Sequence, residues 1–102
     1  MLSTDALALL RTYLMGKLSY AAYVVDGTEF TTAIQSTVLQ DDGRIEATFI
    51  IDHAVDETIT VTEVRLYDQS NVLMASKAET ISQNPGEESI LYSFQFTITE
   101  PA

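Results

Sequence analysis

The chain has 102 residues, with 15 acidic side chains against five basic ones, a net charge of −10, and no cysteine or tryptophan. This length is typical of one domain, so we expect residues 1–102 to form a single unit. The absence of cysteine excludes a disulfide framework, a zinc–thiolate site and a cysteine nucleophile.

The charge pattern also excludes two classes of partner. The five lysines and arginines stand singly, at positions 11, 17, 44, 65 and 77. Nucleic acids and anionic membrane surfaces both attract clustered basic side chains.

No stretch approaches the roughly 20 apolar residues of a membrane span. The first ten residues lack the basic region of a signal peptide. We therefore expect neither nucleic acid nor membrane as a partner.

Residues 4–17 are predicted to form the one helix of the chain. Ser3 or Thr4 can cap it, Asp5 lies in its first turn, and Gly16 can end it.

Apolar residues cover most of the circumference of this helix. The main stripe at helical spacing consists of Leu7, Leu10, Leu14 and Leu18. Ala6 and Leu9 widen the stripe, and Tyr13 lies beside it. Two interpretations remain open. The helix packs on the sheet of its own chain, or it packs on copies of itself or on a neighbouring subunit.

Three β-prone segments follow, separated by turn residues. Leu18–Val25 is closed by Asp26-Gly27, and Glu29–Leu39 is closed by Asp41-Asp42-Gly43. In the second segment one face is predicted to hold Phe30, Thr32, Ile34, Ser36 and Val38.

The segment Arg44–His53 alternates most clearly. Its inward set is Ile45, Ala47, Phe49 and Ile51, whereas Ile50 interrupts the polar face.

Residues 58–81 are predicted to form a hairpin with its turn at Asp68–Asn71. The alternation of the first strand slips, because Ile59 and Val61 share one parity and the next apolar residues, at 64 and 66, share the other. A one-residue change of phase turns later side chains to the opposite face, so we expect a β-bulge near Thr62-Glu63. Glu63 and Arg65 would then project from one face, as a solvated ion pair.

The last strand is predicted over Ser89–Thr99, after a loop at 84–88. Its apolar face consists of Ile90, Tyr92, Phe94, Phe96 and Ile98, and Leu91 has the opposite parity. Six strands at this spacing predict an all-β fold. We expect an antiparallel β-sandwich of about six strands over residues 18–99, with one N-terminal helix over 4–17.

No set of residues suggests catalysis. His53 is the only histidine, and its neighbour Asp52 would point to the opposite face of a strand, so the two form no dyad. The Asp-Gly segments at 26–27 and 41–43 lack calcium-loop spacing and suit tight turns. We expect no enzymatic activity, and no catalytic, cofactor-binding or metal-binding residues.

One segment carries a family resemblance. The hairpin VTEVRLYDQSNVLMA, residues 61–75, resembles the hairpin ITEIGLYD…dGxLIA of phage tail-collar fibre proteins and related prophage virion proteins. The similarity extends over about residues 30–99. Arg65 stands where the family usually has glycine, and Lys77-Ala78 replaces a customary Phe-Pro.

This resemblance implies a non-enzymatic structural protein of a phage or prophage virion, assembled in the host cytoplasm and lying in the tail or fibre-attachment region. Its expected partners are other virion subunits and copies of itself, in a trimer or ring, because an open sheet leaves edges that proteins pair or cover. The candidate interface residues are Leu7, Leu10, Leu14, Leu18, Ile50 and Leu91. The alternative is a carbohydrate-binding or adhesin-like sandwich, which five tyrosines could serve.

Overall fold

The computed structural model describes residues 3–52, 57–85 and 89–98. Over these ranges one helix precedes six strands, and their bounds are α1 (Thr4–Lys17), β1 (Leu18–Val25), β2 (Thr28–Leu39), β3 (Ile45–Ile51), β4 (Ile59–Asp68), β5 (Leu73–Gln83) and β6 (Ile90–Phe96). All neighbouring strands pair antiparallel, in the order β5-β4-β1-β2-β3-β6. The predicted all-β fold with one N-terminal helix is confirmed.

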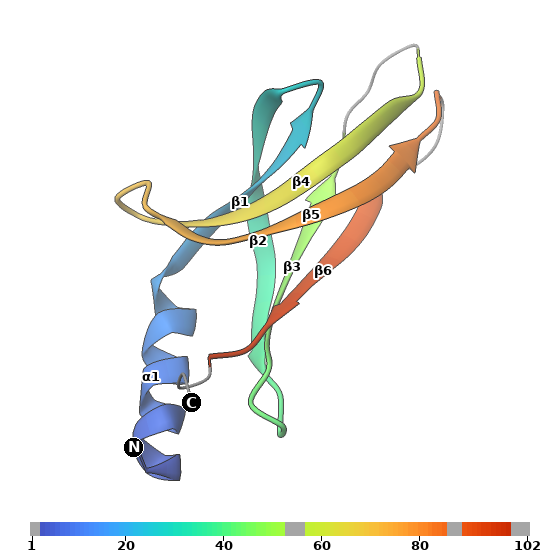
Figure 1. The fold of residues 1–102 in the computed structure, drawn as a ribbon. Coiled ribbons are helices and arrows are strands. Elements are labelled where there is room, and N and C mark those ends of the chain that lie inside the picture. Colours follow the sequence, from blue (N-terminus) through green and yellow to red (C-terminus); the bar gives the residue numbers. More distant parts are fainter. Residues whose placement is uncertain (1–2, 53–56, 86–88, 99–102) are drawn as a thin grey trace.

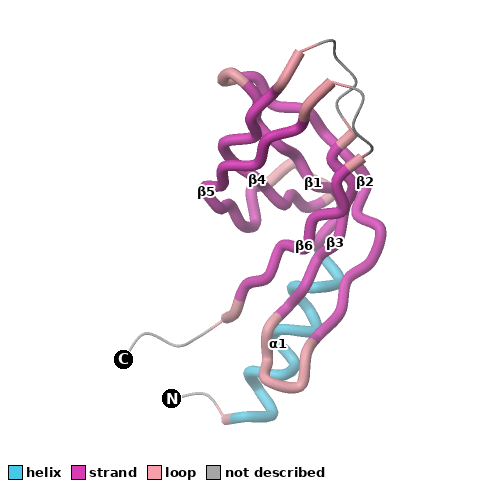
Figure 2. Tube along the Cα trace, turned by 90° about the vertical axis from the view of Figure 1, so that its right-hand side faces the viewer, coloured by secondary structure: helices cyan, strands magenta, loops and turns pink. Residues whose placement is uncertain are grey.

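The two layers of the predicted sandwich are the halves of one curled, almost closed sheet (Figures 1 and 2). Strand β2 joins the halves. Its first part pairs with β1, up to Ala33, and its second part pairs with β3, from Ile34 onward. The register against β3 shifts between Ile34 and Ser36. This irregularity lets the strand turn from one layer into the other.

The shift in β2 corrects one predicted face. Phe30 and Ile34 pack against the core as expected, but Ser36 and Val38 are exposed. The half-buried side chains of this part are Thr37 and Leu39 instead. The small polar residues of β2 obscure the change of phase, because threonine and serine suit either face.

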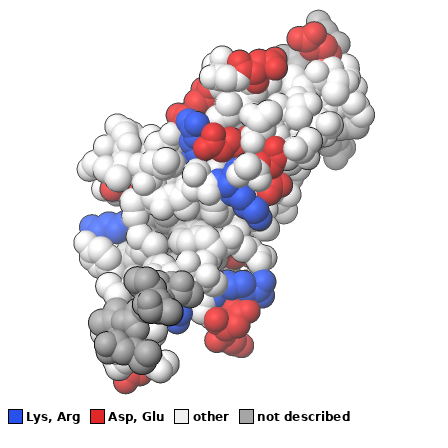
Figure 3. Space-filling view, viewed as in Figure 1, with Lys and Arg blue, Asp and Glu red and all other residues white. Residues whose placement is uncertain are grey.

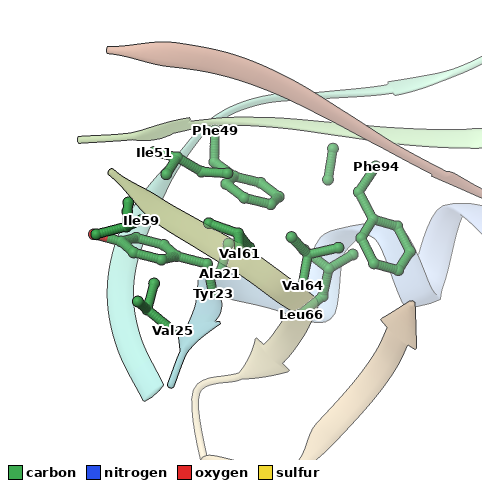
Figure 4. Packing of buried hydrophobic residues seen from close by; sticks show 11 residues of the cluster. Ala21, Tyr23, Val25, Phe49, Ile51, Ile59, Val61, Val64, Leu66 and Phe94 are labelled. Carbon is green, nitrogen blue, oxygen red and sulfur yellow. The ribbon is translucent and has the colours of Figure 1, made fainter. Parts of the chain in front are cut away.

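The core lies between the two layers and is shown in Figure 4. Its buried cluster comprises Ala21, Tyr23, Val25, Ala47, Phe49, Ile51, Ile59, Val61, Val64, Leu66 and Phe94. The largest fully buried side chains are phenylalanines of β3 and β6 and branched aliphatics of β3 and β4. Strand β6 ends at Phe96, before the predicted Thr99, and Ile98 lies beyond it, half-buried.

The predicted bulge in β4 is confirmed. Against β1, Val24 pairs with Glu63 and Val25 pairs with Val61, so Thr62 is the extra residue. Because Thr62 absorbs the change of phase, Val61 and Val64 both point into the core despite their opposite parity.

The tight turns occur where Asp and Gly predict them. Asp26 and Gly27 both have positive φ, at 51° and 77°, as a two-residue hairpin turn requires. At the β4–β5 turn, the Asp68 carboxylate accepts hydrogen bonds from the backbone N–H groups of Ser70 and Val72, at 2.8 and 2.9 Å. Asp26 and Asp68 therefore serve the backbone conformation of the two turns.

Helix α1 starts as predicted, with the Ser3 side chain accepting a hydrogen bond from the Ala6 N–H at 3.1 Å. Gly16 does not end it. The helix runs to Lys17, and Leu18 already has the extended backbone of β1. Without a connecting loop, α1 extends away from the β1–β4 layer and lies beside the β2–β3 hairpin (Figure 1). The molecule is elongated, measuring 51 × 25 × 25 Å.

Candidate functional site

Helix α1 has two apolar faces with different surroundings. Its inner face, Leu7, Leu14 and Met15, is half-buried, and Leu18 at its end packs against the core cluster. On the opposite side, Leu9 is 72% exposed and Tyr13 is 65% exposed. None of the residues 4–17 is fully buried. The sheet of this chain therefore uses only part of the apolar circumference of the helix.

The exposed side is an open apolar surface made by residues of the helix alone, namely Ala6, Leu9, Leu10, Thr12 and Tyr13. We call Ala6, Leu9, Leu10 and Tyr13 the outer helix face. Lys17 ends this face, and its Nζ lies 5.1 Å from the centre of the Tyr13 ring, in cation–π contact.

Charge is distributed unevenly between helix and strands. Helix α1 contains one acidic residue, Asp5, and two basic ones, Arg11 and Lys17. The helix therefore carries +1 and the remaining residues carry −11. In Figure 3 the acidic groups gather mainly over the strands. The outer helix face is thus where a second acidic chain would meet the least electrostatic repulsion.

Arg11 anchors the helix to the end of the sheet. Its Nη2 donates a hydrogen bond to the carbonyl of Ile98 at 3.1 Å. Its guanidinium covers Gly43 so closely that a Cβ at that position would lie 2.9 Å from Arg11 Cζ. These contacts face the β2–β3 turn, opposite the outer helix face, and hold that face toward solvent.

A second apolar patch lies at the β6 edge of the sheet. Leu91 is 67% exposed, and it pairs across the strands with Ile50 of β3, which is half-buried. We call these two residues the β6 edge patch. Strand β6 has a free edge in the described sheet, which exposes backbone hydrogen-bonding groups beside the patch.

The six candidate interface residues fall into two groups, one at the surface and one partly buried by the rest of the chain. Leu10, which is 45% exposed, and Leu91 lie on free surface, and Ile50 lies next to Leu91. Leu7 and Leu14 are instead half-buried, and Leu18 packs against the core cluster.

Two exposed side chains, Leu9 and Tyr13, are absent from that candidate set. The relevant signal was present in the sequence, because apolar residues surround the helix. Spacing alone does not say which side of such a helix the sheet covers.

A polar cluster lies on the outer surface of the β4-β1-β2 layer. Arg65 donates to both Glu63 carboxylate oxygens, at 3.1 and 2.9 Å, which confirms that these side chains share a face. It also contacts Glu29 Oε2 at 2.6 Å, and the Tyr67 hydroxyl donates to the same oxygen. Buried Ala22 lies in β1 between Arg65 and the β2 strand of Glu29.

The cluster shifts the pKa values of its members. Hydrogen bonds from Tyr67 and Arg65 lower the pKa of Glu29, and hydrogen bonds from Arg65 lower the pKa of Glu63. Hydrogen bonding to Glu29 raises the pKa of Tyr67, with a further contribution from burial. The acidic groups are therefore stabilised as carboxylates, which suits a structural ion pair better than an acid–base catalyst.

Next to this cluster is a groove of about 570 Å³. Its lining comprises Tyr20, Thr31, Thr32, Ala33 and Asn71. The Tyr20 ring stacks on Tyr67, with ring centres 5.0 Å apart, and its hydroxyl donates to Asn71 Oδ1 at 2.8 Å. The groove thus offers an oriented aromatic ring beside hydroxyl and amide groups.

Among the described residues, no three His, Cys, Asp or Glu side chains lie close enough together to hold a metal ion. Asp42 accepts from the Arg44 backbone N–H at 3.1 Å and pairs with its side chain, so it serves the turn. Of the Asp52–His53 pair, Asp52 is exposed and His53 lies outside the described residues.

No helix in the described part of the chain is long and apolar enough to cross a membrane. Comparison of the chain with protein-family models, curated proteins and solved structures found no match.

Proposed function

We propose that this protein is a non-enzymatic structural subunit of a phage or prophage virion, in the tail or fibre-attachment region. It acts by binding copies of itself and other virion subunits, with the virion as its final location. The resemblance of the β4–β5 hairpin, residues 61–75, to tail-collar fibre proteins supports the virion assignment. The unpartnered outer helix face is the observation that carries self-association.

The size of this face sets the expected strength of assembly. Fully burying one large apolar side chain contributes about 1.5–3 kcal/mol. Leu9, Leu10 and Tyr13 are 72%, 45% and 65% exposed, so two copies that bury all three would gain about 5–11 kcal/mol on that scale. Association costs about 4–15 kcal/mol in lost freedom, before side-chain ordering. One helix contact therefore gives modest affinity, and a closed ring or trimer that also uses the β6 edge patch would be tighter.

The test is the mass in solution of wild-type and two matched variants, by light scattering. Leu10→Asp places a charge on the outer helix face and should give a monomer with unchanged circular dichroism. Gln69→Asp adds the same charge at an exposed turn and should assemble normally. Leu14→Asp, on the inner face, should lower the melting temperature instead.

A wild-type chain that stays monomeric at high concentration and high salt would contradict self-association. The virion assignment has its own test, since the chain should be detected by mass spectrometry in purified phage particles from its host. Particles that lack it would rule out a structural subunit.

A carbohydrate-binding module is the second candidate, supported by the Tyr20 groove. Tyrosine combines an apolar ring with a polar hydroxyl, and ligand sites combine such surfaces with a few oriented polar groups. Titration with a panel of monosaccharides, followed by NMR, should shift the Tyr20 and Thr31 signals if a sugar binds there. The Tyr20→Ala variant should lose the response, and an unresponsive wild-type protein would eliminate this candidate.

A further inference from the structure

We propose that two copies of the protein pair their α1 helices antiparallel, around a two-fold axis that passes through the outer helix face. This inference rests on the proposed self-association and adds the identity of the partner surface and its orientation. It follows from three features: the order of side chains along the helix, the charges at its ends, and the charge on the strands.

The order of side chains favours the antiparallel arrangement. Ala6, Leu10, Tyr13 and Lys17 follow one another at intervals of four, three and four residues, which places them along one side of the helix. Helices that present side chains at such intervals pack closely at a small crossing angle. The series has the same intervals in both directions, so a reversed partner helix matches it.

This match also pairs large side chains with smaller ones. In the antiparallel pair Ala6 lies opposite the partner copy's position 17, and Leu10 lies opposite its position 13. The methyl group of Ala6 leaves space for the Lys17 stem, and Leu10 packs on an aromatic ring. A parallel pair would instead place Ala6 on Ala6 and Tyr13 on Tyr13, leaving a gap at one level and crowding at the other.

The charges at the ends of the helix are complementary only when the partner is reversed. Asp5 lies in the first turn and Lys17 in the last, and both are exposed. In an antiparallel pair each Asp5, one residue before Ala6, lies at the same end of the pair as the partner copy's position 17, which allows two Asp–Lys ion pairs. A parallel pair would bring Asp5 to Asp5 and Lys17 to Lys17.

The negative charge on the strands also favours the antiparallel arrangement. The residues outside α1 carry −11, and the helix extends from one side of the elongated molecule (Figure 1). Antiparallel pairing directs the two acidic sheets toward opposite ends of the helix pair. Parallel pairing would place them side by side, where like charges repel. Two-fold helix pairing is incompatible with a three-fold trimer, so a larger assembly would be an even-numbered ring that adds a second two-fold contact at the β6 edge patch.

Cysteine cross-linking tests the orientation directly, because the chain contains no cysteine of its own. Two variants, Ala6→Cys and Lys17→Cys, are prepared separately and then mixed in equal amounts under mild oxidation. A disulfide needs its two Cβ atoms within about 3.5–4.5 Å. Antiparallel pairing predicts a mixed disulfide in at least tenfold excess over either homodimer, as measured by intact mass.

A preference for the Ala6→Cys homodimer would overturn the antiparallel arrangement and indicate parallel helices. Absence of any cross-link in a protein that light scattering shows to be oligomeric would overturn helix pairing while leaving self-association in place. A monomeric wild-type protein would contradict the proposed function itself.

Charge reversal provides an independent readout that needs no cross-link. Asp5→Lys and Lys17→Asp should each raise the dimer dissociation constant, on the order of tenfold for the two ion pairs lost per dimer. The double variant should recover the wild-type value, because the pairs are restored with reversed sign. Single variants that dimerise like wild type would contradict the proposed pairing.

Discussion

Replacement of Phe94 by alanine tests the packing between the two layers of the sheet. Phe94 is 2% exposed, pairs with fully buried Ala47 of β3, and meets Phe96 edge-on with ring centres 5.9 Å apart. A buried Phe→Ala change typically costs about 3–5 kcal/mol. Strand β6 is at the edge of the sheet and can partly close the cavity, so we expect the lower end, about 3 kcal/mol.

Urea unfolding followed by circular dichroism measures this loss. Proteins of this size lose about 1–3 kcal/mol of stability per molar urea, so the midpoint should fall by about 1–3 M. All samples need one protein concentration, because self-association makes the midpoint concentration-dependent. Ser93→Ala is the control on the same strand, and loss of its exposed side chain should cost under about 0.5 kcal/mol. A loss below about 1 kcal/mol for Phe94→Ala would place that ring outside the core and refute the packing.

Three further predictions concern the polar contacts and the turns. The lowered pKa of Glu29 means that its contribution to stability is present above its unfolded pKa of about 4.3 and is lost as the pH falls through the folded value. Between pH 5 and 3 the Glu29→Gln variant should therefore lose less stability than the wild-type protein. Melting temperatures that fall equally with pH in both proteins would contradict this. Gly43 has φ +89°, and Gly43→Ala also displaces the Arg11 guanidinium, so urea unfolding should show a loss of about 1–3 kcal/mol. A chelator should leave the melting temperature unchanged, whereas a rise of several degrees on adding calcium would show that the Asp-Gly turns bind metal.

Much of this architecture could be read from strong local patterns. The clean alternation of residues 45–51 identifies β3, and the phase slip between Val61 and Val64 identifies the bulge in β4. Both signals depend on large apolar residues, whose exposure would be costly. The bend in β2 escaped prediction because its phase change falls among Gln35, Ser36 and Thr37, which tolerate either face.

The order of strands in the sheet could not be read in the same way. Hairpin turns determine which consecutive strands pair, as at Asp26-Gly27. The pairings of β4 with β1 and of β6 with β3 join segments far apart in the chain. These two pairings form only because they allow the apolar faces of both layers to be buried against each other. The same limit applies to α1, since an apolar circumference does not reveal which side its own sheet covers.

The proposed assembly must overcome repulsion between copies that each carry −10. Antiparallel helices reduce the repulsion by keeping the acidic sheets apart, but at 0.01 M salt the Debye length is about 30 Å and the sheets still interact. At 0.15 M it is about 8 Å, so the repulsion is largely screened, whereas the contacts of Leu9, Leu10 and Tyr13 are apolar and persist. Association should therefore tighten between 0.01 and 0.15 M salt, as measured by sedimentation equilibrium. Steady weakening over this range would mean that ion pairs, and not the outer helix face, hold the copies together.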